Sequence, residues 1–335
     1  MPKAVFIGNG IHRVFPDNAI SWENLLEGLS QNENLIDNLP GIEDINLDNP
    51  LKPFPLAFEE LIQLGNNHNL GPEERIKLLK EEIHSIFREQ VDNGRNEFNE
   101  FHEEVMQSDI TDVITSNYDY GFELAGRIDF YANKQSIADY RREKTANLRR
   151  SYTIGKKKVW HMHGELFDSV NHANPSPSNF AEQSILMGYR HYAKNLADIK
   201  GYIDGVHRDI PYIMTRLGTN DDMEISWVDK FFTHDIDIFG FGLGFEEQDV
   251  WWLLNYRANK IRTNENRNRA HIDNQIRFIV RSYKDQELAD LTYRQRVNFD
   301  KDNAVKEILS AMEVNVIEIE AVDWVDFYSQ IIAGL

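Results

Sequence analysis

Six short apolar runs constrain the fold of this 335-residue chain more than any other feature of its sequence. Each run is rich in Val, Ile or other apolar residues, and longer polar or helical stretches separate one from the next. The runs lie at residues 4–7, 112–115, 158–161, 235–239, 276–280 and 314–319. Short apolar strands that alternate with helices are typical of a parallel sheet that is covered on both faces. We therefore predict an α/β fold with a Rossmann-like, doubly wound and mostly parallel sheet.

Helical patterns and long connections fill the spaces between these runs. Residues 31–55 are rich in Asn, Asp and Pro and predict a long connection. Apolar residues at helical spacing predict a helical insertion at about 55–107, and residues 168–232 predict a second insertion of loop and helix. The loop at 168–180 directly follows a polar segment and suits a lid over a site. We expect one domain over residues 1–335 with these two insertions.

Acidic side chains outnumber basic ones by 55 to 36, which gives the chain a formal charge of −19. Proteins that bind nucleic acid through their general surface use clustered Lys and Arg, so we expect no direct nucleic-acid partner. An Arg- and Lys-rich stretch at 141–158 stands out against this acidic background. We interpret it as a solvated face, with a docking patch for an acidic partner as the alternative.

The chain contains no cysteine. Structural disulfides, thiolate zinc sites and a cysteine nucleophile are therefore excluded. No apolar run approaches the roughly 20 residues that cross a bilayer, and the amino-terminal run is too short for a signal peptide. We expect a soluble cytoplasmic protein with no membrane partner.

Two polar segments directly follow strand-like runs, Thr-Ser-Asn-Tyr-Asp at 115–119 and His-Met-His-Gly at 161–164. The amide of Asn117 can hold a ribose hydroxyl or a water, and the carboxylate of Asp119 can accept a hydrogen bond from a carboxamide. His163 titrates near neutrality and can take a proton from a hydroxyl group. The alternative for the two Asx residues is a local turn in which they bond to their own backbone.

Glycine turns follow the first and fourth strand-like runs, Gly8-Asn9-Gly10 and Gly240-Phe241-Gly242. Glycine allows backbone N–H groups to approach a phosphate closely at a strand-to-helix turn. His12 and Arg13 follow the first turn and are candidates for a phosphate or ribose contact. The alternatives are an ordinary turn and a solvated basic pair.

His161 and His163 lie two residues apart at the end of a strand, so their side chains share one face. Two imidazoles at this spacing can contribute to a metal site, which needs three or more ligands. No third ligand stands out from the sequence around them, although carboxylates are abundant. We therefore predict no metal site.

Taken in order, the two glycine turns and the two polar segments resemble the sirtuin-like NAD-binding family. The likeness covers most of the chain. It is similar above all to the bacterial sirtuin-like NADases of anti-phage defence, such as those of Thoeris and of systems that pair a sirtuin-like subunit with a hexameric ATPase. The resemblance implies that Asn117 positions the ribose and a water, and that His163 acts on the ribose hydroxyls.

The same resemblance implies a coenzyme site built from the glycine turns and the residues beside them. Asp119 corresponds to the residue that contacts the nicotinamide carboxamide. Ser116 stands where classical sirtuins have glutamine, and the four-cysteine zinc module of the deacylases has no counterpart here, so no zinc is expected. Both differences count against protein deacylation. The implied coenzyme-binding residues are Gly8, Asn9, Gly10, His12, Ser116, Asp119, Gly240, Phe241 and Gly242.

We predict hydrolysis of NAD⁺ to nicotinamide and ADP-ribose. Cleavage of the nicotinamide–ribose bond develops oxocarbenium character, so the site must orient the ring and admit one water. Depletion of the cellular NAD⁺ pool, a homo-oligomer and a partner of the hexameric DNA-translocase ATPase type are further expectations that the resemblance implies. The alternatives are deacylation or ADP-ribosyl transfer with NAD⁺, and a regulatory subunit that senses NAD⁺ or ADP-ribose without turnover.

Overall fold

The computed structural model describes residues 1–14, 22–47, 49, 52–65, 69–92, 98–127, 129, 138–139, 146–165, 185–206, 211–218, 226–264, 272–283 and 291–335. Within these residues eight strands form one sheet in the order β3-β4-β5-β2-β1-β6-β7-β8. The strands are β1 (Lys3–Ile7), β2 (Asp112–Thr115), β3 (Ala138–Asp139), β4 (Ser151–Ile154), β5 (Lys157–His161), β6 (Asp235–Phe239), β7 (Ile276–Ser282) and β8 (Asn315–Glu320).

Six neighbouring strands, β5, β2, β1, β6, β7 and β8, all run parallel, which confirms the predicted α/β fold. Along the chain the sheet grows from β1 to β2 and β5 on one side, and then from β6 to β7 and β8 on the other. The direction of winding therefore changes between β1 and β6, and ligands of doubly wound sheets bind beyond the carboxyl ends of the strands at such a point. The short strands β3 and β4 are antiparallel additions that the sequence did not predict.

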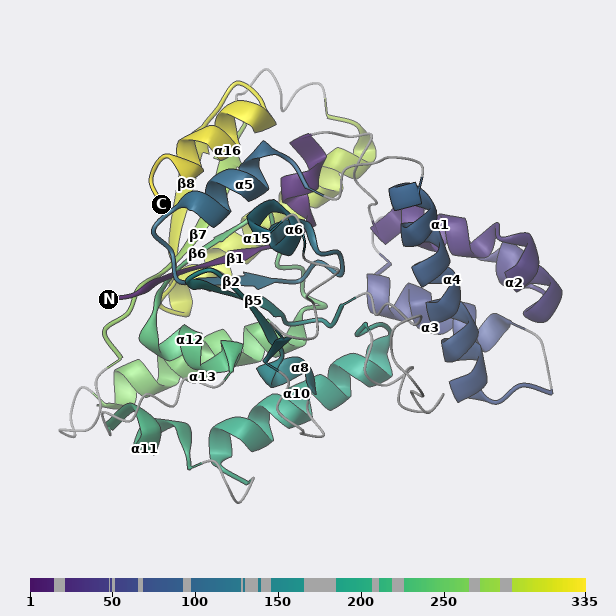
Figure 1. Cartoon of the computed structure of the whole chain (residues 1–335). Coiled ribbons are helices and arrows are strands. Elements are labelled where there is room, and N and C mark those ends of the chain that lie inside the picture. The colour runs from purple at the N-terminus through teal and green to yellow at the C-terminus, as the bar shows by residue number, and fades with distance from the viewer. Residues whose placement is uncertain are drawn as a thin grey trace.

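Helices cover both faces of the sheet (Figure 1). Val5 and Ile7 of β1 pack with α5 (Glu100–Gln107), α6 (Gly121–Gly126) and α16 (Trp324–Ile332). Ala4 and Phe6 face the opposite layer, which shows the alternation expected of a strand buried on both sides. No described helix is both long and apolar enough to cross a membrane. The opposite layer contains α8 (Ala146–Arg149), α10 (Tyr189–Asp204), α11 (Ile213–Gly218), α12 (Trp227–Thr233), α13 (Gln248–Asn264) and α15 (Tyr293–Ala311).

A lobe of helices lies beside the sheet and has an apolar core of its own (Figure 1). Its core also contains Tyr118, from the polar segment after β2, whose hydroxyl donates to the Leu186 carbonyl at 2.7 Å. We call this unit the helical lobe. It comprises α1 (Trp22–Ser30), α2 (Glu33–Asn38), a 3₁₀ turn η3 (Ile42–Asp44), α3 (Phe54–Leu64) and α4 (Pro72–Asp92).

The helical lobe differs from the predicted insertion at about 55–107. It begins near residue 22, because the Asn- and Pro-rich stretch contains short helices whose apolar residues join the lobe core. It ends before α5, which packs on the sheet. Within the second predicted insertion, 168–232, the described helices α10 and α12 pack on the sheet. The predicted lid at 168–180 lies outside the described residues.

A buried ion cluster joins β2, β5 and α12 at the amino end of the strands. The carboxylate of Asp112 accepts from Trp160 Nε1 at 2.8 Å and lies 3.2 Å from Lys230 Nζ and 3.1 Å from His234 Nε2. Burial alone would raise the pKa of Asp112, but the hydrogen bond from His234 and the charge of Lys230 hold that pKa well below its usual range. The Asp112 carboxylate therefore stays ionised and links β2, β5 and α12 at this end of the sheet.

Asp112→Asn should lower the free energy of unfolding by about 3–5 kcal/mol at pH 7, because it leaves the buried Lys230 ammonium without its carboxylate partner. Since the folded pKa of Asp112 is depressed, its stabilisation is present above about pH 4 and is lost as the pH falls below that value. Urea unfolding at pH 7 and pH 3 measures both effects. The exposed Glu103→Gln is the control, and a variant that loses as much stability at pH 3 as at pH 7 would contradict this account.

Candidate functional site

Polar segments that follow β1, β2, β5 and β6 meet at the carboxyl edge of the sheet. The strand register brings them level, because Thr115 pairs with both Ile7 and His161, and Ile7 pairs with Phe239. The segments after β2 and β5 therefore leave the sheet side by side. This edge includes the winding change between β1 and β6, where the topology places a ligand site.

The amide of Asn117 is buried and lacks a hydrogen-bond partner. The residue is 6% exposed, and neither Oδ1 nor Nδ2 bonds to any described group. Its backbone is fixed, since its N–H donates to Thr115 Oγ1 at 3.0 Å and that hydroxyl donates to the Ile7 carbonyl at 2.9 Å. An unpaired buried amide costs about 1–3 kcal/mol, so its persistence indicates a role in holding a ligand or a water. The local turn proposed as an alternative does not use this side chain.

His161 links Asn117 to α6 through two hydrogen bonds. Its Nδ1 lies 3.0 Å from the Asn117 carbonyl and its Nε2 lies 2.8 Å from Glu123 Oε1, all fully buried. A carbonyl oxygen can only accept a hydrogen bond, so Nδ1 carries a proton. Nε2 carries a second proton and donates it in a hydrogen bond to the Glu123 carboxylate. Burial disfavours the imidazolium, but the charge of Glu123 raises the pKa of His161 to about 9. His161 is therefore a buried cation that positions Asn117.

His161→Ala should lower the free energy of unfolding by about 3–5 kcal/mol, because it leaves the Glu123 carboxylate buried without its cation. Adding Glu123→Gln to that variant should recover part of the loss, since it removes the stranded charge. Urea unfolding of the single and double variants measures this coupling. The ion pair would not matter in this way if the double variant were no more stable than His161→Ala.

Asp119 and His12, both predicted to contact the coenzyme, are paired with each other. His12 Nε2 lies 3.2 Å from Asp119 Oδ2, while Asp119 Oδ1 accepts from the Gly121 N–H at 2.9 Å. Burial would raise the pKa of Asp119, but the charge of His12 and its hydrogen bond hold that pKa well below its usual range. His12 is 7% exposed and its ring lies tilted against that of His102, so His12 itself is not solvated; the Arg13 side chain lies outside the described part of the chain. The alternative predicted for Asp119, a local turn in which it bonds to nearby backbone, is therefore present for one of its two oxygens.

The two predicted glycine turns pack tightly against each other. The N–H of Gly10 donates to the Gly240 carbonyl at 2.7 Å, and a Cβ at Gly8 or Gly10 would lie 2.7 Å from backbone atoms of Gly240. Gly240 itself has a φ of +62°, which favours glycine. Gly242 differs, because a Cβ there would meet nothing within 4 Å among the described residues. Phe241 stacks near Phe6 with ring centroids 4.5 Å apart and faces the core.

Gly10→Ala should therefore lower the free energy of unfolding by roughly 1–3 kcal/mol, because the new methyl group collides with backbone rather than with a flexible side chain. Gly242→Ala is the matched control and should change stability by less than about 0.5 kcal/mol. Urea unfolding compares the two variants. Similar losses in both would show that close packing does not explain the first glycine turn.

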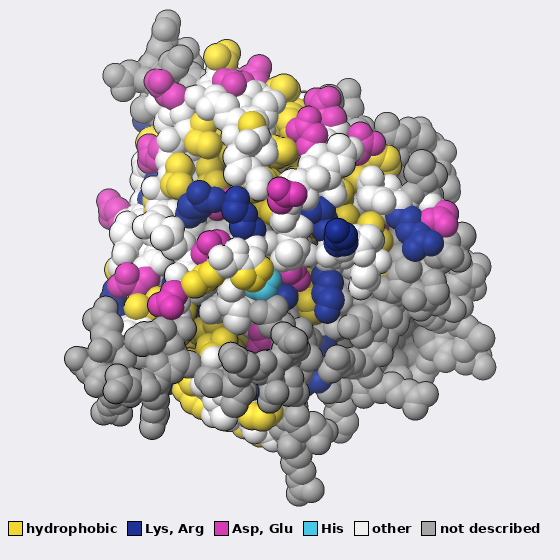
Figure 2. Space-filling view, turned by 60° about the vertical axis from the view of Figure 1, so that its left-hand side comes forward, with side chains coloured by type: hydrophobic (Ala, Val, Ile, Leu, Met, Phe, Trp, Pro, Cys, Tyr) yellow, Lys and Arg dark blue, Asp and Glu magenta, His cyan; other side chains and the backbone are white. Residues whose placement is uncertain are grey.

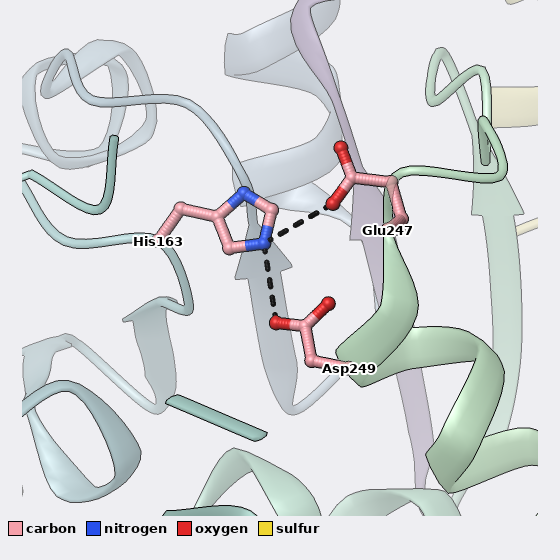
Figure 3. A group of neighbouring side chains, drawn as sticks. All are labelled: His163, Glu247 and Asp249. Atoms are coloured by element: carbon pink, nitrogen blue, oxygen red, sulfur yellow. Dashed lines mark ion pairs between the residues drawn. The ribbon is translucent and has the colours of Figure 1, made fainter. Parts of the chain in front are cut away.

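His163 faces two carboxylates that the sequence did not associate with it (Figure 3). Its Nε2 lies 3.5 Å from Glu247 Oε2 and 3.5 Å from Asp249 Oδ2, at the turn that leads from β6 into α13. Asp249 is held in place by Asn195 Nδ2 at 2.8 Å, and the Tyr192 ring packs edge-on against His163. The two carboxylates lie two residues apart just after the second glycine turn, and that spacing is the signal that could have found them.

The charges of this group depend on one another. Burial disfavours the His163 imidazolium, but Glu247 and Asp249 raise the pKa of His163 above its ordinary value. Burial raises the pKa of Glu247 to about 8, whereas the pairing with His163 outweighs burial and lowers the pKa of Asp249. All three ligand atoms lie within 4.8 Å of one another, close enough to share a cation.

The backbone of His163 is fixed by the segment that crosses beside it. Gly164 forms an isolated antiparallel bridge with Ile185, and the Leu186 N–H donates to the His163 carbonyl at 2.6 Å. Gly164 has a φ of +87°, which favours glycine at this turn.

Much of the basic stretch at 141–158 is buried, so its interpretation as a solvated face is wrong for these residues. Arg149, Arg150 and Lys157 are each less than 10% exposed. Arg150 Nη1 pairs with Glu165 Oε1 at 3.0 Å, and Lys157 donates to the Ile110 carbonyl at 2.7 Å. On the face that Figure 2 shows, described basic and acidic side chains are interspersed. Residues 141–145 lie outside the described part of the chain.

No protein-family model matches the chain, and no curated protein matches it in sequence. The likeness to sirtuin-like proteins therefore stays a prediction from the four sequence motifs.

Proposed function

We propose that the protein is an NAD⁺ glycohydrolase that cleaves the nicotinamide–ribose bond to give nicotinamide and ADP-ribose. One observation carries the proposal: the buried, unpartnered amide of Asn117 stands beside the His161–His163 segment at the carboxyl edge of a doubly wound sheet. Doubly wound sheets bind dinucleotides at this edge. A buried amide with no partner of its own is suited to hold a ribose hydroxyl or a water there.

The reaction asks for positioning more than for covalent chemistry. The bond from C1′ to the nicotinamide nitrogen breaks, its electron pair leaves with nicotinamide, and water adds to the ribose and gives up a proton. Asn117 orients the ribose or the water, and its buried surroundings strengthen that contact as positive charge develops on the sugar. Asp119 remains ionised, and its lone pairs beyond those used by His12 and Gly121 can accept from the carboxamide.

His163 supplies the proton chemistry at the ribose hydroxyls. Its Nε2 faces the two carboxylates, and in Figure 3 the other ring nitrogen, Nδ1, points away from both. When Nε2 carries the proton of the neutral imidazole, Nδ1 has a free lone pair and accepts a proton. Asp249 thereby plays the part of a carboxylate that orients a catalytic imidazole.

The biological setting follows from the resemblance and belongs to the same proposal. NAD⁺ is the substrate, the location is cytoplasmic, and the consequence is depletion of NAD⁺ during anti-phage defence. A homo-oligomer and a hexameric DNA-translocase ATPase partner would restrain the activity until infection. Without a four-cysteine zinc module, deacylation has no observation in its favour.

Asn117→Ala should abolish nicotinamide release, with a fall in rate of at least 100-fold, while changing the free energy of unfolding by less than about 1 kcal/mol. The removed amide makes no hydrogen bond in the described structure, so little stability depends on it. His163→Ala should abolish turnover as well. The assay incubates the full-length protein with NAD⁺, alone and with acetylated peptide, and separates the products by chromatography.

Asn34→Ala, an exposed Asn on α2, is the matched control and should retain the wild-type rate. A folded Asn117→Ala protein with near-normal turnover would contradict the assignment of Asn117 to the active site. NAD⁺ binding without nicotinamide release would favour the sensing subunit, and release that requires acetylated peptide would favour the deacylase.

A further inference from the structure

The distances around His163 are unusual for hydrogen bonds. Nitrogen–oxygen hydrogen bonds are about 2.7–3.2 Å long, yet His163 Nε2 lies 3.5 Å from both Glu247 Oε2 and Asp249 Oδ2. Neither His163 Nε2 nor Glu247 Oε2 makes a hydrogen bond with any described residue. His163 is only 1% exposed, so its unpartnered nitrogen is buried and aimed between two carboxylates (Figure 3).

The same distances suit three ligands of one metal ion. Two ligand atoms that each lie about 2.1 Å from Zn²⁺ at a tetrahedral angle are about 3.4 Å apart. The two separations of 3.5 Å match this value, and all three ligand atoms lie within 4.8 Å of one another. The third separation, between Glu247 Oε2 and Asp249 Oδ2, lies within 4.8 Å and must be about 3.4 Å when all three atoms bind one ion.

The surroundings hold the three groups in this arrangement. Asp249 accepts from Asn195 Nδ2 at 2.8 Å through Oδ2 and from the Val250 N–H at 2.9 Å through Oδ1. The Tyr192 ring packs edge-on against His163 at 5.3 Å between centroids. Such outer contacts orient metal ligands and limit the loss of freedom on binding.

We propose that His163, Glu247 and Asp249 bind one divalent cation of the Zn²⁺ type, and that this cation holds the proposed NAD⁺ hydrolase inactive. One imidazole and two carboxylates without a thiolate suit Zn²⁺ and related divalent ions, and three protein ligands leave a fourth position open. Two positive charges on the ion balance the charges of two ionised carboxylates. This site is separate from the four-cysteine module that the chain lacks.

The inhibitory part of the proposal rests on the proposed function. An imidazole that binds a cation through Nε2 is neutral and carries its one proton on Nδ1. Nδ1 then has no lone pair with which to accept a proton from a ribose hydroxyl. Occupancy of the site thus removes the base, and loss of the cation restores it.

Isothermal titration of chelator-treated, full-length protein with ZnCl₂ tests the site without any assay of activity. We expect one ion per chain with a dissociation constant in the micromolar range or tighter. Glu247→Gln and Asp249→Asn should each weaken binding at least 10-fold, whereas the neighbouring Glu246→Gln should bind as the wild type does. If Asp249→Asn fails to fold, Glu247→Gln still decides, because the replaced oxygen has no hydrogen bond to lose in the described structure.

Nicotinamide release by the same proteins, with and without Zn²⁺, tests the inhibition. Wild-type turnover should fall at least 10-fold with Zn²⁺ and return on chelation, and whatever turnover Glu247→Gln retains should resist the same concentration. No binding, or equal binding by the wild type and both carboxylate variants, overturns the site. Binding with unaltered turnover overturns the inhibition. Binding by a protein that never releases nicotinamide leaves the site in place and overturns the hydrolase.

Discussion

The hydrogen bond from His161 to the carbonyl of Asn117 joins the two strand ends on which the candidate site depends. It exists because β2 and β5 are parallel neighbours in register, which brings both polar segments to one level of the sheet. The Glu123 carboxylate keeps the imidazole charged, so the bond is charge-assisted and buried. The backbone of Asn117 is thus held in place, while its side-chain amide bonds to no described group.

Buried ion pairs lie at both ends of the sheet in a protein whose acidic side chains outnumber its basic ones. At the amino end Asp112 gathers Lys230 and His234, and at the carboxyl end imidazoles pair with Glu123 and with Asp249. In each case a buried carboxylate on or beside the sheet lies against a basic side chain. Such pairs add little net stability over apolar packing, but removing one partner is expensive, so they specify which surfaces meet.

The sequence was sufficient for the parallel strands and for the two motifs that carry Asn117 and His163. Continuous apolar runs are a strong local signal, and topology then requires their carboxyl ends to share an edge. The contact of Glu247 and Asp249 with His163 was not predicted, because it joins the ends of β5 and β6 across β1 and β2, and no local pattern records such a contact. The basic stretch was misread for a similar reason, since burial of Arg150 depends on its distant partner Glu165.

The short helices of the helical lobe were hidden by composition. Asn and Pro usually mark connections, but Asn32 caps α2 through the Leu35 N–H at 3.0 Å, and Pro53 precedes α3. The positions of the glycine turns were predicted correctly from sequence. The N–H of Gly10, however, donates to the Gly240 carbonyl. A pattern of glycines thus shows where backbones approach closely, and only coordinates show what they approach.

Tyr118 places the side chain next to Asn117 inside the core of a different unit. Its ring is packed among the apolar residues of the helical lobe, and its hydroxyl is tied to the Leu186 carbonyl. The backbone of Asn117 is thereby held from two sides. His161 bonds to its carbonyl from the sheet, and the helical lobe holds the adjacent residue, Tyr118. A rotation of the helical lobe against the sheet would therefore move Tyr118 and, with it, the neighbouring Asn117.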